Sequence, residues 1–332
     1  MSTFTQVGAT SVARKAGRSA SFRRKSPAWH GVAEWGIRAT ALLAIAAIVL
    51  IFVFILKEAL PILFDTHVRG EVSLAKMWLP QAWEGGPARF SWQPASEVPK
   101  YSLMPLVVGS LKVTIVALVI SAPIAILAAI YTASIAPRRV REVLKPVVEL
   151  LAGVPSVVLG VFALIVVGTW LQKLFGFEHR LNAVLAGCAL SMTIVPLIFT
   201  IAEDAITAVP RDYVDASLAL GATKMHTILR VVVPAAIPGI AAGIVLGFGR
   251  AIGETMIVVI ASGNAALLDA TLGHSTRTIT ATIAQEMGET VHGSPHYVVL
   301  FVLGATLLAF TFVTNLGAQR IVEHFRKKRG GT

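Results

Sequence analysis

The sequence predicts an all-α polytopic membrane protein with six transmembrane helices. Its 332 residues are 55% hydrophobic and have a mean hydropathy of +0.74, which is too apolar for an ordinary soluble domain. The run ALLAIAAIVLIFVFIL at residues 41–56 reaches, with its flanks, the roughly 20 residues needed to cross a hydrocarbon core of about 30 Å. Basic residues gather at the two ends of the chain, as expected beside membrane spans.

Apolar segments place the spans and thereby the domains. The predicted spans are residues 36–57, 106–135, 147–172, 181–202, 235–262 and 297–318, with the second and third interrupted by Pro123 and Pro155, which membrane helices tolerate. The predicted domains are a basic, disordered cytoplasmic tail at 1–35, a transmembrane domain at 36–319 with a cytoplasmic loop at 203–233, and a basic cytoplasmic tail at 320–332.

The net charge of +11 comes almost entirely from the two tails. With the N-terminus inside, the cytoplasmic segments hold 19 Lys and Arg and the outer loops hold 8. This asymmetry predicts that both termini are cytoplasmic. It favours contact with anionic lipid over nucleic-acid binding.

Motifs of enzymes are missing from the sequence. It contains no G-x-x-x-x-G-K-[ST] loop for a nucleotide, no H-E-x-x-H zinc motif and no nucleophile elbow. Cys188 is the single cysteine, which excludes an intramolecular disulfide and a multi-thiolate metal site. We therefore expect no enzymatic activity, no metal and no cofactor in this chain.

The clearest motif lies on the predicted cytoplasmic side, in DASLALGATKMHTILRVVVP at residues 215–234. It predicts a short helix, a turn at Gly221 and a second helix that begins at Thr223, because glycine closes helices in the left-handed conformation and threonine is a good N-cap. Pro234 is expected at the entry to the fifth span. A short helix of this kind can dock in a partner's groove, although the pattern also fits an amphipathic helix resting on the bilayer.

This spacing resembles the EAA motif of ABC-importer permeases. Asp215, Ala216 and Ser217 stand for the acidic opening, Gly221 for the glycine, and VVVP, ending at Pro234, for the close. Asp replaces Glu, Ser replaces the second Ala, and Val replaces Ile and Leu. The resemblance implies that this loop is the coupling helix that inserts into a cytoplasmic ATPase subunit.

Further segments resemble the phosphate-importer permeases of the PstC-like kind. These are GRAIGETM followed by GN, LLAGVPSVVLGVFAL at 150–164 and GSLKVTIVALVISAPIAILAAIY at 109–131. The resemblance covers about residues 100–320 and implies the type I ABC importer permease architecture in a bacterial inner membrane. It also implies three partners: a PstA-like permease, a cytoplasmic ATPase dimer that holds ATP and Mg, and a periplasmic phosphate-binding protein.

Two charges interrupt the apolar fifth span. On one helix, Arg250 and Glu254 would share a face with Gly239, Gly243 and Gly247, a Gly-x-x-x-Gly surface that packs closely on another helix. Arg250 would lie too deep to snorkel, and charges within membranes are usually functional. We therefore expect Arg250 to contact an anionic substrate and Glu254 to weaken that hold, whereas Glu149 is expected to be an interfacial charge near Lys145.

Other interpretations remain open at this stage. The Arg250 and Glu254 pair can be structural, although burying an ion pair is weak evidence for stability. The substrate can be sulfate, molybdate or another oxyanion. An ion-coupled secondary transporter would leave the loop at 215–234 unexplained, and a membrane scaffold would leave the charged glycine face unexplained.

Overall fold

The computed structural model describes residues 28–82 and 88–328. The chain divides into two units, Met1–Phe52 and Val53–Thr332. The first unit contains most of helix α1 (Ala28–Ala59), and the second contains all other elements. The expected disordered tail lies outside the described residues up to residue 27; from Ala28 onwards the backbone is helical, because the apolar span extends in the N-terminal direction.

The second unit is mostly helical, with one small hairpin. Its longer helices are α5 (Met104–Ile130), α6 (Arg138–Ala152), α9 (Ala183–Thr207), α12 (Val233–Ile252) and α15 (Pro295–Lys328). Its shorter helices are α2 (Pro61–Phe64), α3 (Thr66–Glu71), α4 (Leu74–Trp78), α7 (Ser156–Phe162), α8 (Gly168–Phe175), α10 (Arg211–Ala219), α11 (Lys224–Thr227), α13 (Met256–Ala261) and α14 (Ile279–Glu286). Strands β1 (Trp92–Gln93) and β2 (Lys100–Tyr101) pair antiparallel.

Short π-helical and 3₁₀ turns continue several helices. The π-helical turns are η1 (Tyr131–Ile135), η2 (Ala163–Val167) and η3 (Ile228–Val232), and the 3₁₀ turn is η4 (Met287–Glu289). Each π turn extends or joins α-helices without a break in the chain direction. Such turns inside helices are frequent at functional positions.

Six helical stretches of the described residues are long and apolar enough to cross a membrane. They are Ala33–Phe64, Met104–Ile135, Ser156–Phe175, Ala183–Thr207, Lys224–Ile252 and Pro295–Gly317. The predicted number of spans is therefore confirmed, but the bounds of the third and fifth spans were wrong. The third span begins at Ser156 rather than at residue 147, because α6 is a separate amphipathic helix. The fifth runs from Lys224 to Ile252 rather than over 235–262.

The C-terminal boundary also differs from the prediction. Helix α15 continues the last span as far as Lys328, so residues 320–328 of the expected tail are helical. The second span likewise runs unbroken through Pro123, whereas Pro155 does stand at a break, between α6 and α7.

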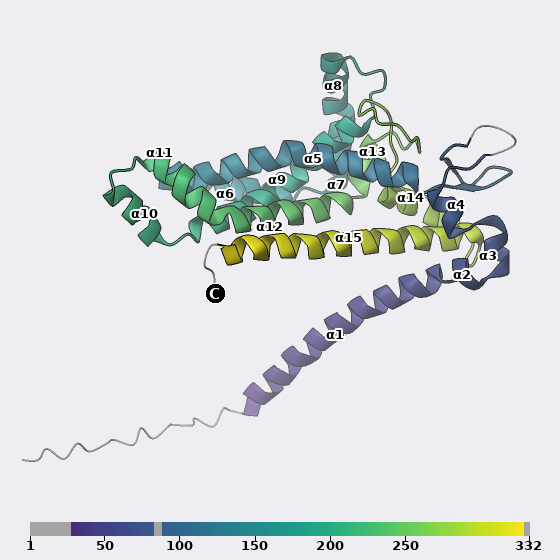
Figure 1. The fold of residues 1–332 in the computed structure, drawn as a ribbon, viewed down its shortest axis with the longest axis horizontal. Coiled ribbons are helices and arrows are strands. Elements are labelled where there is room, and N and C mark those ends of the chain that lie inside the picture. The colour runs from purple at the N-terminus through teal and green to yellow at the C-terminus, as the bar shows by residue number, and fades with distance from the viewer. Residues whose placement is uncertain (1–27, 83–87, 329–332) are drawn as a thin grey trace, which may run out of the picture. The chain divides into compact units, whose positions relative to one another are not determined.

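Helix α9 lies at the centre of the bundle. It packs against α5 and α12, and α12 packs in turn against α15; Figure 1 shows these four helices running alongside one another. Five large side chains of α9 are fully buried: Leu185, Leu190, Ile194, Ile198 and Phe199. Burial of side chains of this size contributes about 1.5–3 kcal/mol each in water, and within a bilayer close packing takes over this role.

Small residues set the distance between α9 and α12. A Cβ atom at Gly239 would lie 2.3 Å from the Cβ of Ala205 on α9, and one at Gly247 would lie 2.9 Å from Cδ1 of Ile198. At Gly243 the nearest atom would be 3.4 Å away. The three glycines thus face α9 and allow the two backbones to approach closely.

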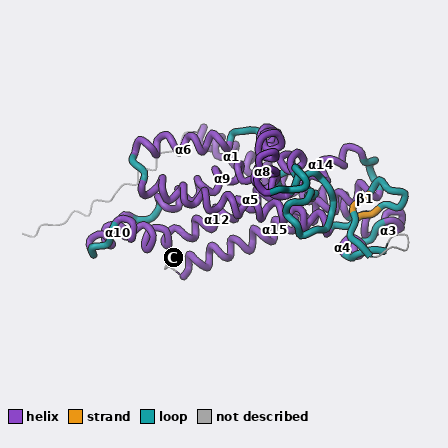
Figure 2. The backbone as a smooth tube through the Cα atoms, turned by 90° about the horizontal axis from the view of Figure 1, so that it is seen from above, coloured by secondary structure: helices purple, strands orange, loops and turns teal. Residues whose placement is uncertain are grey.

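A compact cap covers the end of the bundle that lies away from α10. Figure 2 shows α3, α4 and β1 gathered there. Its apolar core joins Val68, Met77 and Trp92, from the segment between α1 and α5, to Leu106 of α5 and Leu303 of α15. These described parts of the segment are therefore packed onto the bundle.

A buried carboxylate ties this cap together. Glu286 of α14 accepts hydrogen bonds from Nε1 of Trp92 at 3.0 Å and pairs with Arg277 at 2.7 Å and with His296 at 2.9 Å. Burial alone would raise the pKa of Glu286, but the hydrogen bonds from His296 and Trp92 and the charge of Arg277 outweigh it and lower that pKa below its usual value. The carboxylate stays ionised and links three segments.

The glycines at the α9–α12 contact give a direct test of this packing. We expect Gly239→Ala to destabilise the protein by about 1–3 kcal/mol, because the added methyl group has no space beside Ala205. Gly249→Ala on the same helix is the matched control, since its Cβ would meet only Asn315, at 3.7 Å; it should stabilise the helix by up to about 1 kcal/mol. Thermal unfolding in detergent measures both, and equal melting temperatures for the two variants would contradict the assigned contact.

Candidate substrate pathway and coupling loop

The fifth span ends just before Glu254. Helix α12 stops at Ile252, residues 253–255 are not helical, and α13 starts at Met256. The backbone carbonyl of Glu254 accepts a hydrogen bond of 2.8 Å from the hydroxyl of Thr280. The sequence predicts Arg250 and Glu254 on successive turns of one helix, but the helix ends between them. It ends there because glycine is a poor helix former and because Thr280 donates to the carbonyl of Glu254, which no N–H of a described helix reaches.

The expected ion pair is not formed. Within the described part of the chain, the side chains of Arg250 and Glu254 share no ion pair or hydrogen bond. The change of chain direction at Gly253 accounts for this, since it removes the one-turn spacing. Arg250 lies on α12, on the same face as Gly239, Gly243 and Gly247, as predicted. Glu254 lies instead in the non-helical link between α12 and α13.

Arg250 lines a hollow of about 370 Å³. The hollow is walled by α9 on one side and by the end of α6 on the other, and its lining residues are Glu149, Ala152, Thr193, Pro196, Leu197, Thr200, Ile201 and Arg250. Pro196 lies near the middle of α9, so the hollow opens at about the middle of a transmembrane helix. The guanidinium is exposed in this single chain.

Two threonines add hydroxyl groups to the wall. Thr193 donates to the carbonyl of Leu190 at 2.9 Å, and Thr200 donates to that of Pro196 at 3.0 Å. The two residues are seven apart and so lie on one face of α9. Each hydroxyl can rotate to donate to an anion instead of to its helix carbonyl.

Glu149, which was expected to be an interfacial charge near Lys145, also takes part in this hollow. It lines the hollow with Arg250, whereas its expected neighbour Lys145 binds α9 instead, at 2.8 Å from Glu203 and 3.4 Å from Asp204. The hydrogen bond to Glu203 is the main reason that the pKa of Lys145 is raised above its usual value. The sequence could have predicted the threonine side of the hollow, because Thr193 and Thr200 are two polar residues seven apart in an otherwise apolar helix.

The hollow suits a small oxyanion. Arg250 offers a planar set of N–H donors that matches two oxygens of such an anion. The threonine hydroxyls add neutral donors, and the carboxylate of Glu149 offsets the formal charge of Arg250. A partly neutralised site holds an anion weakly enough to release it, which is what conduction requires.

The loop at the other end of α12 contains two short helices. Helix α10 ends where Gly221 takes φ +84°, and the Thr223 side chain caps α11 by accepting from the backbone N–H of His226 at 3.3 Å. The hydroxyls of Ser217 and Thr227 lie 2.9 Å apart and join the two helices. The turn and the cap are as the sequence predicted.

The loop presents its surface outward. Asp215 and Ala216 are exposed on α10, and Leu220 beside the turn is 90% exposed. The loop proper covers residues 208–223 rather than 203–233, because α9 ends at Thr207 and α11 begins at Lys224. Pro234 consequently lies inside the continuous span Lys224–Ile252 and does not mark its entry. The π turn η3 ends just before it, where the N–H of Val233 donates to the carbonyl of Ile228.

Comparison with known proteins assigns the family. Residues 122–327 match the model of a family described as "Binding-protein-dependent transport system inner membrane component". The chain belongs to this family. It is therefore a multi-pass permease of an inner membrane, and the family implies an ATPase and a substrate-binding protein as partners.

Curated relatives are similar over most of the permease. One is a Bacillus subtilis protein named "Probable ABC transporter permease protein YqgH", 38% identical over 224 residues, which cover 67% of this chain and 72% of the relative. Another is the "Phosphate transport system permease protein PstC" of Mesorhizobium japonicum, 33% identical over 242 residues, with 67% and 73% covered.

Solved structures confirm the fold of the permease. A chain of a bacterial alginate ABC transporter in complex with a periplasmic protein superposes with a TM-score of 0.59 at 15% identity, covering 90% of this chain and 98% of that chain. A chain of the MetNI methionine ABC transporter gives a TM-score of 0.51 at 18% identity, covering 67% and 94%. The predicted type I ABC importer permease architecture is thereby confirmed.

Proposed function

We propose that this permease is the membrane-spanning subunit of an ATP-driven importer of inorganic phosphate. The observation that carries the proposal is the mid-membrane hollow in which Arg250 lies with Thr193 and Thr200. The similarity to a relative named as a phosphate permease supports the same substrate. In this proposal Arg250 contacts the anion during transport, and Glu254 acts only through the position of the break between α12 and α13.

Glu149 favours phosphate over sulfate in the same hollow. Phosphate keeps at least one proton at neutral pH, because only its second ionisation lies near pH 7 and its last proton is lost only in strongly alkaline solution. Its P–OH group can therefore donate to a carboxylate, whereas fully ionised sulfate has only acceptors and is repelled. A permease for sulfate or molybdate is the second candidate, and it would have no use for a carboxylate at this position.

The remaining parts of the transporter follow from this function. A periplasmic binding protein would deliver phosphate to the capped end, and a PstA-like permease would complete the pathway around the exposed Arg250. A cytoplasmic ATPase dimer, which holds the ATP and Mg, would bind the exposed α10 and α11. Neither cofactor nor metal is proposed for this chain, and ATP-driven motion would alternate the access of the hollow.

Substitution of Arg250 tests the pathway. We expect Arg250→Gln to lower the initial rate of labelled phosphate uptake in cells by at least about tenfold, because glutamine keeps the size but loses the charge. Arg230→Gln is the matched control: Arg230 is exposed in η3 and lies outside the hollow, so uptake should remain near that of the wild type. Normal uptake by Arg250→Gln at equal membrane levels would refute the role.

Substitution of Glu149 tests whether this carboxylate excludes sulfate from the hollow. In Glu149→Gln, unlabelled sulfate should compete with phosphate uptake, whereas it should not in the wild type. Adding this change to Arg250→Gln should not restore uptake, since the hollow would then contain no cationic donor for the anion. Restoration would mean that the two charges serve only to balance each other.

Gly221 tests the docking of the ATPase. A non-glycine residue at φ +84° costs about 1–2 kcal/mol, and no atom lies within 4 Å of a Cβ placed there. We therefore expect Gly221→Val to insert normally but to co-purify less ATPase, while Gly221→Asn should retain it because asparagine tolerates this conformation. Equal recovery of the ATPase with the valine variant would contradict a coupling role for the turn.

We also propose that both termini face the cytoplasm. Val291, near the start of α15, is 75% exposed and would lie outside, whereas Leu220 in the coupling loop would lie inside. In a Cys188→Ala background, Val291→Cys should react with an impermeant thiol reagent in intact cells, and Leu220→Cys should react only after the membrane is opened. The reverse pattern would invert the topology.

A further inference from the structure

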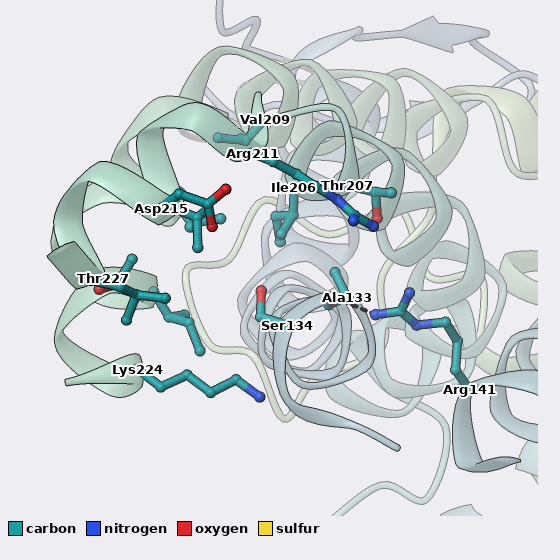
Figure 3. A pocket seen from close by; sticks show the side chains of 14 residues that line it. Ala133, Ser134, Arg141, Ile206, Thr207, Val209, Arg211, Asp215, Lys224 and Thr227 are labelled. Atoms are coloured by element: carbon teal, nitrogen blue, oxygen red, sulfur yellow. Dashed lines mark hydrogen bonds between the residues drawn. The ribbon is translucent and has the colours of Figure 1, made fainter. Parts of the chain in front are cut away.

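A second cavity lies between the membrane helices and the two short helices α10 and α11, which are called the coupling helices here. Its volume is about 390 Å³, and it is separate from the hollow at Arg250. One wall comes from α10, α11 and η3; the other comes from η1, the start of α6 and the end of α9. Figure 3 shows this space with its labelled side chains.

The cavity is lined by three cationic side chains and one carboxylate. Arg211 and Lys224 belong to the coupling helices, Arg141 belongs to α6, and the carboxylate is that of Asp215. In Figure 3 Lys224 extends its ammonium toward Ser134, and Arg211 extends along the wall toward Thr207. The net formal charge of the lining is therefore positive, which favours an anion in this space.

Two of these cations form no ion pair with any residue that the structure describes. Over residues 28–82 and 88–328, Arg211 and Lys224 form no ion pair or hydrogen bond. Arg141 is held in place, since its Nε donates to the carbonyl of Thr132 at 2.8 Å and another of its nitrogens donates to that of Ala133. A fixed guanidinium with two unpaired cations around a shared space is a typical arrangement for binding an anion.

Hydroxyl groups complete the set of donors. Ser134 makes no hydrogen bond among the described residues, and Thr207 makes only a long one, at 3.4 Å to Glu203. Both line the cavity. Donors on several sides of one space match a tetrahedral anion better than a planar carboxylate, which two parallel donors satisfy.

We propose that this cavity binds a phosphate group, either as free inorganic phosphate or as the headgroup of an anionic lipid. Bound there, the phosphate would join Lys224 and Arg211 of the coupling helices to Arg141 and Ser134 of the membrane helices. Occupancy would thus fix the coupling loop relative to the bundle. The binding itself is independent of the proposed function; only the consequence for ATPase coupling rests on it.

Protection of a cysteine in the cavity tests the proposal. The assembled transporter, with Cys188→Ala and Ser134→Cys in this chain, is placed in nanodiscs of phosphatidylcholine and treated with N-ethylmaleimide, a neutral reagent. Phosphate at about nine times its dissociation constant should slow the labelling of Ser134→Cys about tenfold, because only the empty site reacts. Chloride at the same ionic strength should have no effect.

A second arm separates the two sources of phosphate. Nanodiscs that contain phosphatidylglycerol are labelled without free phosphate. Protection in this arm alone assigns the site to a lipid headgroup, and protection by added phosphate alone assigns it to the free anion. Absence of protection in both arms overturns the proposal, as does a cysteine that is unreactive under every condition, which would mean that a partner subunit fills the cavity.

Charge variants show whether the protection arises in the cavity. Lys224→Gln and Arg211→Gln should each remove the protection, while Arg139→Gln, an exposed arginine on α6 outside the lining, should leave it unchanged. Protection that survives both cavity variants would overturn the proposal. If phosphate still protects Ser134→Cys in the Arg250→Gln variant, this cavity is distinct from the transport pathway. The two proposed roles can then fail independently of each other.

Discussion

The close approach of α12 to α9 is the constraint on which the rest of the structure depends. Gly239 and Gly247 leave no space for a Cβ atom against Ala205 and Ile198, so side chains of α9 pack directly on the backbone of α12. This contact places Arg250 beside the middle of α9, and with it the hydroxyls of Thr193 and Thr200. A wider spacing would separate the charge from the threonines. The small residues therefore define the hollow as much as the polar ones do.

The same helix connects the hollow to the coupling loop. From Lys224 to Ile252 the chain forms one continuous helical span, which begins at the turn of Gly221 and ends two residues beyond Arg250. Displacement of the loop by an ATPase would be transmitted along this span, because a packed helix moves as a unit. The π turn η3 and the break after Ile252 are the places where the span can bend.

Much of this arrangement could be predicted from the sequence, because its causes are local. Hydropathy gave the six spans, and the glycine turn at Gly221 with its cap at Thr223 followed from backbone preference. Other features depend on contacts between distant residues. Thr280 of α14 donates a hydrogen bond to Glu254 at the break after α12. Lys145 forms its ion pair with Glu203 and not with Glu149. In the cap, Trp92 donates a hydrogen bond to Glu286. Hydrophobic periodicity contains no information about such long-range polar partners.

Uptake of labelled phosphate into proteoliposomes tests the central claim most directly. The vesicles would contain the complete transporter, with ATP and Mg inside and the binding protein outside. The account predicts accumulation of phosphate that requires ATP and continues when ionophores abolish every ion gradient. Accumulation that needs no ATP and stops with the ionophores would contradict it and indicate an ion-coupled transporter, and ATP-driven uptake of sulfate in place of phosphate would contradict the assigned substrate.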